Sequence, residues 1–530
     1  MIEQTYVNIL NQRSSGILLP IFSLPGPHGI GDIGPSAHAF LDFLKQSGQS
    51  CWQILPLGPT NPLFGNSPYM SSSAFACSPL FISLDVLVEE GLIRKGEMGD
   101  HIFSEYSVDY QEVAAFKQSL INLAWERFRT QPLNRTRLKE FVATHPWAHQ
   151  YGLFEALKNH FHDAPWFTWP DPLRHREPAA LADAANLHKS FIDYVVFEQF
   201  LITRQWQRLR EYANSLGITL VGDLPIYLAL DSADVWEHQQ LFQLDRQKSL
   251  PTHVAGVPPD YFSPTGQRWG NPLYRWDADD PLIVTALWAW WEQRLRHNFT
   301  FVDTLRLDHF RGFESYWAVP AEEETALNGC WQPGPGKAFF HAMEQRLGGM
   351  SIIAEDLGSI TPEVEELRND LGYPGMNILL FAFDGDPNNS YLPYNIEKKS
   401  IVYTGTHDND TAVGWYLNPD VPQTSKQRAK GFANRADDHA GSFHHDIIYL
   451  AMGSPANLAI LPMQDVLGFG NDCRLNVPGT TANNWQWRCA QRFINEEISS
   501  WLHEQTTFFG RLSKNKCLCP KTFAAKNPDV

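Results

Sequence analysis

Apolar residues recur along the chain in two patterns, short continuous runs and longer stretches with helical spacing. Gly16–Ile21 and Trp52–Pro56 are short apolar runs typical of buried strands. Between them, Ser36–Gly48 has apolar residues at the i, i+3, i+4, i+7 spacing of a helix, with Ser36 as its expected N-cap and Gly48 at its end. A strand, a helix and a strand in succession predict a βαβ unit.

The same alternation returns in the second half of the chain. Helices are expected at Val284–Leu295 and at Glu363–Leu371, the latter begun by Thr361-Pro362 and ended by Gly372. Six more apolar runs are expected strands: Ile218–Pro225, Phe301–Asp308, Ser351–Glu355, Met376–Phe381, Ile401–Thr406 and Leu458–Pro462. Eight mostly apolar strands alternating with helices predict an α/β fold, a (β/α)8 TIM barrel, whose site lies at the strands' C-terminal ends.

One region departs from this alternation. Residues 87–201 contain amphipathic helices such as Val113–Phe128 and Phe191–Leu201, separated by the Trp/Pro-rich stretch WFTWPDPL. We therefore expect a helical insertion subdomain at 87–201, between barrel portions 1–86 and 202–512. Residues 513–530 are expected to form a disordered tail.

Composition narrows the class of function. The 530-residue chain has a formal net charge of −17, which argues against nucleic-acid binding, since that depends on Lys and Arg. No apolar run approaches the roughly 18 residues of a membrane span, and the N-terminus does not resemble a signal peptide. The seven scattered cysteines include no CxxC pair, as expected of reduced thiols. We expect a cytoplasmic protein without nucleic-acid or membrane partners.

Acidic residues close four of the expected strands. They are Asp223, Asp308, Glu355 and Asp408, and a barrel would bring them to one mouth. Arg306 shares a strand face with Asp308, so we expect it to lower the pKa of Asp308 and keep it ionised, as a retaining glycosidase nucleophile requires. The alternative is a structural ion pair, although four converging carboxylates are hard to explain as structural because like charges repel.

Local context suggests further roles. Asp356 alternates with Glu355, so only one can face the mouth, and anionic neighbours should raise the pKa of Glu355, as suits a general acid/base. Asp408 lies in THDND, where His407 and Asn409 could donate to sugar hydroxyls and Asp408 could bind the strained ring. The alternative is a polar turn with self-bonding Asx side chains. THDND has no metal-ligand spacing, and neither metal nor cofactor is expected.

These segments resemble a known family. RLDHFRG, the Glu in IIAEDLG, and THDND are similar to the nucleophile, acid/base and stabiliser segments of the α-amylase clan, and the fuller resemblance is to 4-α-glucanotransferase (amylomaltase, disproportionating enzyme). It extends from about Ser15 to Leu512. Its further motifs are SPYMSSSAF (Ser67–Phe75), GDLPIY (Gly222–Tyr227), AGVPPDYFSPTGQRWGNPLY (Ala255–Tyr274), GTHDNDT (Gly405–Thr411), QDVLG (Gln464–Gly468) and NVPGT…NW.WR (Asn476–Arg488).

The resemblance implies a role for each matching residue. Asp308 would be the nucleophile, Glu355 the acid/base and Asp408 the transition-state stabiliser. The implied partners are maltodextrins and other α-1,4-glucans, with glucose as an acceptor. The implied substrate-binding residues are Arg306, His407, Tyr69, Asp223, Tyr261, Phe262, Trp269, Asn271 and Gln464.

Transfer differs from hydrolysis in whether a sugar hydroxyl or water completes the reaction. The aromatic loop Ala255–Tyr274, with Tyr261 and Phe262, is expected to cover the acceptor and exclude water, although a packed Pro/Gly/aromatic loop is the alternative. Two rival functions stay open: an α-1,4-glucan hydrolase with the same three carboxylates, and a non-catalytic glucan-binding barrel.

Overall fold

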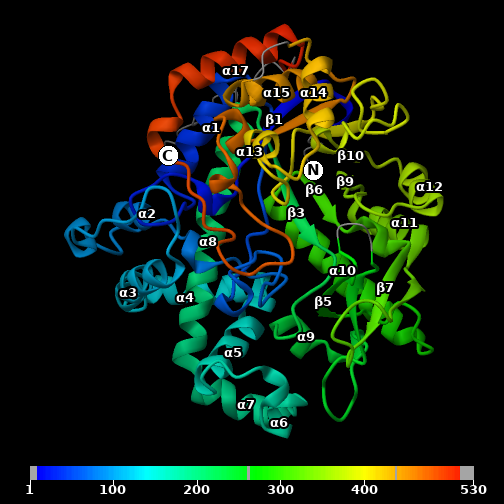
Figure 1. Ribbon diagram of the computed structural model, residues 1–530. Helices are drawn as coiled ribbons and strands as arrows, with labels where there is room; N and C mark the ends of the chain where they lie inside the picture. The colour runs from blue at the N-terminus through cyan, green and yellow to red at the C-terminus, as the bar shows by residue number, and fades with distance from the viewer. Residues whose placement is uncertain (1–8, 260–262, 436–438, 514–530) are drawn as a thin grey trace, which may run out of the picture.

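The short apolar runs pair side by side into one parallel sheet, seen at the centre of the computed structural model (Figure 1). The structure describes residues 9–259, 263–435 and 439–513. Eight strands follow the order β10-β11-β12-β1-β2-β3-β6-β9. They are β1 (Ser14–Leu18), β2 (Cys51–Gln53), β3 (Thr219–Pro225), β6 (Thr304–Asp308), β9 (Ile352–Ala354), β10 (Gly375–Ile378), β11 (Ser400–Tyr403) and β12 (Leu458–Pro462).

The two end strands of this sheet come together. The backbone N–H of Ala354, the last residue of β9, donates to the carbonyl of Pro374 at 3.0 Å, directly before β10. The sheet is thereby a nearly closed barrel, which confirms the predicted fold. The first and last strands of the barrel in sequence, β1 and β12, are neighbours, with Ser14 opposite Leu458 and Leu18 opposite Pro462.

Helices surround the strands, and some begin or end elsewhere than predicted. The first begins at Pro35 after Gly34, so Ser36 is not its N-cap. The helix before β6 continues to Phe301, so β6 starts only at Thr304, because the apolar residue Phe301 suits both a helix end and a strand start. The surrounding helices include α1 (Pro35–Gln46), α10 (Pro281–Phe301), α11 (Gly336–Leu347), α12 (Pro362–Leu371), α13 (Ala412–Leu417), α14 (Gln423–Phe432), α15 (Phe443–Gly453) and α17 (Glu496–Phe508).

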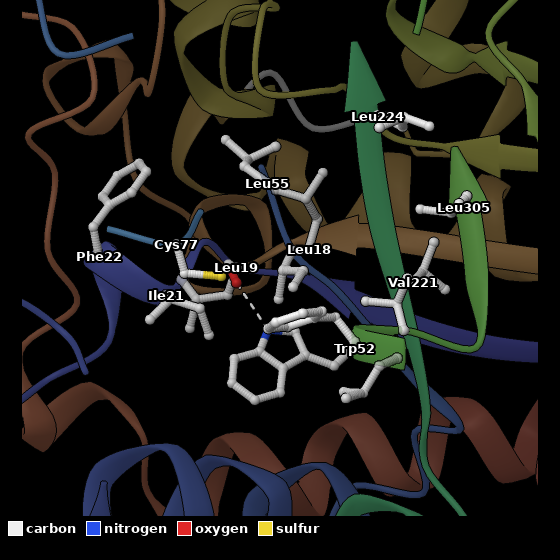
Figure 2. Close-up of a cluster of buried hydrophobic side chains, with 14 of the residues drawn as sticks. Leu18, Leu19, Ile21, Phe22, Trp52, Leu55, Cys77, Val221, Leu224 and Leu305 are labelled. Atoms are coloured by element: carbon white, nitrogen blue, oxygen red, sulfur yellow. Dashed lines mark hydrogen bonds between the residues drawn. The ribbon is translucent and has the colours of Figure 1, made fainter. Parts of the chain in front are cut away.

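The strands meet in an apolar core, part of which Figure 2 shows. Trp52 of β2 is fully buried beside Leu18 of β1 and Val221 of β3. Its indole N–H donates to the carbonyl of Leu19 at 2.8 Å, so the only polar atom of the side chain is paired. Burying each large apolar side chain stabilises the fold by roughly 1.5–3 kcal/mol.

The region 87–201 is helical, as its periodicity predicted, and lies to one side of the barrel (Figure 1). Its last helix, α8 (Lys189–Leu216), runs through residue 201 without a break, and it contacts both α5 (Trp147–His160) and the barrel helix α1. The boundary expected at residue 201 therefore falls inside one continuous helix. The helices are α2 (Leu84–Glu89), α3 (Tyr110–Phe128), α4 (Pro132–Thr144), α5 (Trp147–His160), α6 (Asp171–Arg174), α7 (Pro178–Leu187) and α8 (Lys189–Leu216).

A second sheet was not predicted. It is antiparallel, in the order β5-β4-β7-β8, with β4 (His253–Val257), β5 (Gln267–Pro272), β7 (Ser315–Pro320) and β8 (Cys330–Pro333). Much of the expected aromatic loop is thus a hairpin of β4 and β5. A register shift between Val254 and Gly256 interrupts the regular alternation of side chains in this hairpin. Tyr274, expected in that loop, is fully buried and donates its hydroxyl to the carbonyl of Ile226 at 2.8 Å.

Candidate active site

The acidic strand ends gather at one mouth of the barrel around a single guanidinium. Nη1 of Arg306 lies 2.8 Å from both carboxylate oxygens of Asp223 and 2.9 Å from Oδ1 of Asp308. The hydroxyl of Tyr69 donates to Oδ2 of Asp223 at 2.8 Å. The alternation of β6 therefore places Arg306 and Asp308 on one face, as predicted, and the parallel partner β3 brings Asp223 to the same point.

Arg306 lowers the pKa of Asp308, as predicted, but the pKa as a whole is raised and not lowered. Burial raises the pKa of Asp308 to about 6, more than the attraction to Arg306 lowers it. The negative charge of Asp223, which also pairs with Arg306, adds to the increase. Asp308 is still mostly ionised at pH 7.

Glu355 follows β9 directly and is held by two backbone donors. Its Oε2 accepts from the N–H of His309 at 2.8 Å, and its Oε1 from the N–H of Leu357 at 3.0 Å. Burial raises the pKa of Glu355 to about 8, and Asp308 adds to the increase. The predicted direction is confirmed, with burial as the larger cause. Asp356 turns away and accepts from the N–H of Met376 at 2.8 Å.

Asp408 lies in the loop after β11 with its two carboxylate oxygens bound by different segments. Nε2 of His407 is 3.2 Å from Oδ2, and Nδ2 of Asn476 donates to Oδ1 at 2.6 Å. Burial raises the pKa of Asp408, but His407 and, to a smaller extent, Asn476 lower it by more. The pKa of Asp408 is therefore well below its ordinary value. Asn409 stabilises a turn, which was the alternative to binding a sugar hydroxyl: its Oδ1 accepts a hydrogen bond from the N–H of Thr406 at 2.8 Å.

Aromatic rings enclose this side of the mouth. The ring of Tyr69 stacks on that of His407 with centroids 5.2 Å apart, and Trp485 lies 5.8 Å from each of them. Trp485 adopts a left-handed conformation, with φ of 60°, and its carbonyl accepts from the hydroxyl of Tyr110 on α3 at 2.7 Å. The sequence interpretation missed Trp485 and Asn476 individually, although both lie in the motif Asn476–Arg488.

Three further predicted binding residues, Trp269, Asn271 and Gln464, contact other parts of the chain. Trp269 packs edge-to-face on His309, with ring centroids 4.8 Å apart, and the backbone N–H of His309 binds Glu355. Asn271 is buried and donates to the carbonyl of Leu228 at 2.8 Å, and Gln464 is buried and donates to the carbonyl of Cys473 at 3.2 Å. These two bonds support neighbouring loops. Tyr261 and Phe262 lie outside the described residues.

Two other features of the described residues bear on the class of protein. No group of three or more His, Cys, Asp or Glu side chains in residues 9–259, 263–435 and 439–513 could hold a metal ion. None of the helices in those ranges combines the length and the hydropathy that crossing a membrane requires.

A (β/α)8 barrel that holds one mostly ionised and one mostly protonated carboxyl group at its mouth is typical of barrel enzymes that act on glycosidic bonds. Within this class, residues 19–493 match the family model described as 4-alpha-glucanotransferase. The chain belongs to this family.

Individual relatives agree. The chain is 45% identical to a 4-alpha-glucanotransferase of Synechocystis sp. over 515 residues, which cover 95% of this chain and 99% of the relative. It is 43% identical to that of Thermus thermophilus, covering 94% of this chain and 99% of the relative. The structure of a Streptococcus agalactiae amylomaltase in complex with acarbose is 36% identical, with a TM-score of 0.90 over 95% of this chain and all of that one.

Proposed function

We propose that the protein moves segments of one α-1,4-glucan to the 4-position of glucose or of another α-1,4-glucan, by a retaining double displacement. The observation that carries this proposal is the pair Asp308 and Glu355, whose pKa values of about 6 and about 8 leave the first ionised and the second protonated near pH 7. These are the protonation states that a nucleophile and a general acid require.

In the first half-reaction, a carboxylate oxygen of Asp308 attacks the anomeric carbon while the bond from that carbon to the leaving O4 breaks. Glu355 gives its proton to this O4, which departs as the 4-hydroxyl of the released chain. Asp408 accepts hydrogen bonds from hydroxyl groups of the strained ring. It stays ionised because His407 and Asn476 stabilise its charge.

In the second half-reaction, the 4-hydroxyl of the acceptor gives its proton to Glu355, and its oxygen attacks the anomeric carbon. The ester bond to Asp308 breaks, and the two inversions restore the α-configuration. The backbone donors from His309 and Leu357 hold the carboxylate of Glu355 in place for both proton transfers.

Transfer also needs a sugar in place of water at the second step. The hairpin of β4 and β5 supports this, because it carries Trp269 to the ring of His309 beside the acid/base. We propose that this hairpin covers the acceptor side. We also expect the enzyme to act in the cytoplasm: the described cysteines are all free thiols, as is usual in a reducing compartment.

Incubation of the purified protein with maltotriose tests the proposal, with free glucose, the product ladder and total reducing ends followed together. Transfer gives glucose and longer maltodextrins at a constant number of reducing ends. Rising reducing ends with only shorter products would establish the hydrolase instead. No change by a folded protein, with sugar binding that Asp308→Ala leaves intact, would favour the glucan-binding barrel.

Glu355→Gln tests the role of the acid/base in the same assay. The amide cannot donate a proton as a carboxylic acid does, so we expect glucose release to fall by roughly 10²- to 10⁴-fold. Glu363→Gln on α12, an exposed position, is the matched control and should leave the rate unchanged. Near-normal turnover of maltotriose by Glu355→Gln would remove Glu355 from this role.

A further inference from the structure

We propose that Asn476 and Arg474 are positioning residues that fix the orientation of Asp408. The inference rests on the proposed function, in which Asp408 binds the strained sugar ring. Both residues lie in the segment after β12, far in sequence from the loop after β11 that carries Asp408.

Asn476 acts on the carboxylate itself. Its Nδ2 donates to Oδ1 of Asp408 at 2.6 Å, while His407 approaches the other oxygen, Oδ2, at 3.2 Å. Two donors from different segments on the two oxygens fix the rotation of the carboxylate plane about its last side-chain bond, which is otherwise a soft torsion. Each oxygen keeps a lone pair for a sugar hydroxyl, since a carboxylate oxygen can accept two hydrogen bonds.

Arg474 fixes the backbone on both sides of this contact. Its guanidinium donates to the carbonyl of Asp408 and pairs with the carboxylate of Asp410, and its Nε donates to the carbonyl of Asn476 at 2.6 Å. One planar cation thus ties the backbone of Asp408 to that of Asn476, the residue that orients it. A lysine could not hold three such acceptors in fixed directions.

Neighbouring charges also pull on the carboxylate of Asp408. Asp308 lies near Asp408 and repels its charge, whereas His407 and Arg306 attract it. Without Asn476, the carboxylate of Asp408 would be drawn toward His407 and Arg306 alone, away from the orientation that leaves both oxygens open to the ring.

The test is Asn476→Asp, which keeps the shape and replaces the donor with a group that repels Asp408. We expect kcat for maltotriose disproportionation to fall roughly ten- to a hundredfold and KM to change less than about threefold, as follows from losing a hydrogen bond to a charged group that matters most at the strained ring. Asn483→Asp, an exposed position in the same segment, is the matched control and should behave as the wild type. Equal kcat in the two variants would overturn the inference.

A double-mutant cycle shows whether Asn476 acts through Asp408. Acarbose, the ligand in the Streptococcus agalactiae structure, serves as a calorimetric probe that needs no turnover. Asn476→Ala should weaken acarbose binding roughly tenfold in the wild-type background and less than about twofold in the Asp408→Asn background. Equal losses in both backgrounds would show that Asn476 acts independently of Asp408.

Arg474→Lys provides a second variant that retains the charge. We expect it to lower kcat while its melting temperature stays close to that of the wild type, and a full rate would overturn the part assigned to Arg474. The wild type in the same maltotriose assay separates the two proposals. Absence of transfer by the wild type contradicts the proposed function, whereas transfer by the wild type and by Asn476→Asp alike contradicts only the positioning role.

Discussion

At the scale of single residues, the paired carboxyl groups predict a bell-shaped dependence of kcat/KM on pH. Asp308 must be ionised, so the rate rises with pH through about 6, and Glu355 must be protonated, so it falls through about 8. We therefore expect an optimum near pH 7, measured as initial glucose release from maltotriose. Glu363→Gln on the surface should leave both limbs in place. A rate that stays flat from pH 5 to pH 9 would contradict the assignment.

The candidate residues could be predicted from the sequence, but their charge states could be predicted only in part. Asp308, Glu355 and Asp408 end apolar runs, which was enough to place them at one mouth. The pKa of Asp308 depends first on its burial and then on Arg306 and Asp223, which meet in a contact between β3 and β6. No local sequence pattern contains either feature. Asn476 likewise reaches Asp408 from a segment with no periodicity to mark it.

At the scale of elements, the helical region 87–201 contacts the site through Tyr110, the first residue of α3. The hydroxyl of Tyr110 donates to the carbonyl of Trp485, whose ring packs against Tyr69 and His407. Since Trp485 is held at a φ of 60°, which a residue other than glycine rarely adopts, this bond helps to keep the ring in place.

We expect Tyr110→Phe to lower kcat/KM for maltotriose roughly three- to tenfold. It should also destabilise the fold by only about 1 kcal/mol, as for one hydrogen bond lost. Steady-state kinetics and thermal unfolding measure the two effects separately. Tyr449→Phe, at an exposed position on α15, is the control. If both variants retain full activity, the insertion does not act on the site through this bond.

The elements that could be predicted are those with a clear pattern of apolar residues. The eight barrel strands are mostly apolar because both of their faces are covered, and all eight were recognised. The antiparallel sheet was missed because its strands carry Gly and Pro and are partly exposed; β8, for example, is largely exposed. Such strands have no pattern that distinguishes them from a loop.

At the scale of the whole molecule, the segment that follows α17 binds the paired strands β1 and β12 at the face of the barrel opposite the site. Arg511 follows α17 and is fully buried, and its guanidinium lies between the N-terminal ends of β1 and β12. It donates to the carbonyls of Ser14, Ala456 and Asn457 beside these strands. It also donates to the carbonyls of three residues at the end of α15: Ala451, Met452 and Ser454.

Arg511→Met should therefore destabilise the fold while leaving the chemistry intact. Removal of the guanidinium leaves several buried carbonyls unpaired, so we expect the free energy of unfolding to fall by at least about 3 kcal/mol, visible as a lower melting temperature. Well below that temperature kcat should stay within about twofold of the wild type, because the change lies at the far end of the strands from Asp308. Arg246→Met, at an exposed position, is the control. Equal melting temperatures for the two variants would show that the pairing of β1 with β12 does not depend on Arg511. A loss of kcat in a stably folded Arg511→Met would show that the two ends of the barrel are coupled.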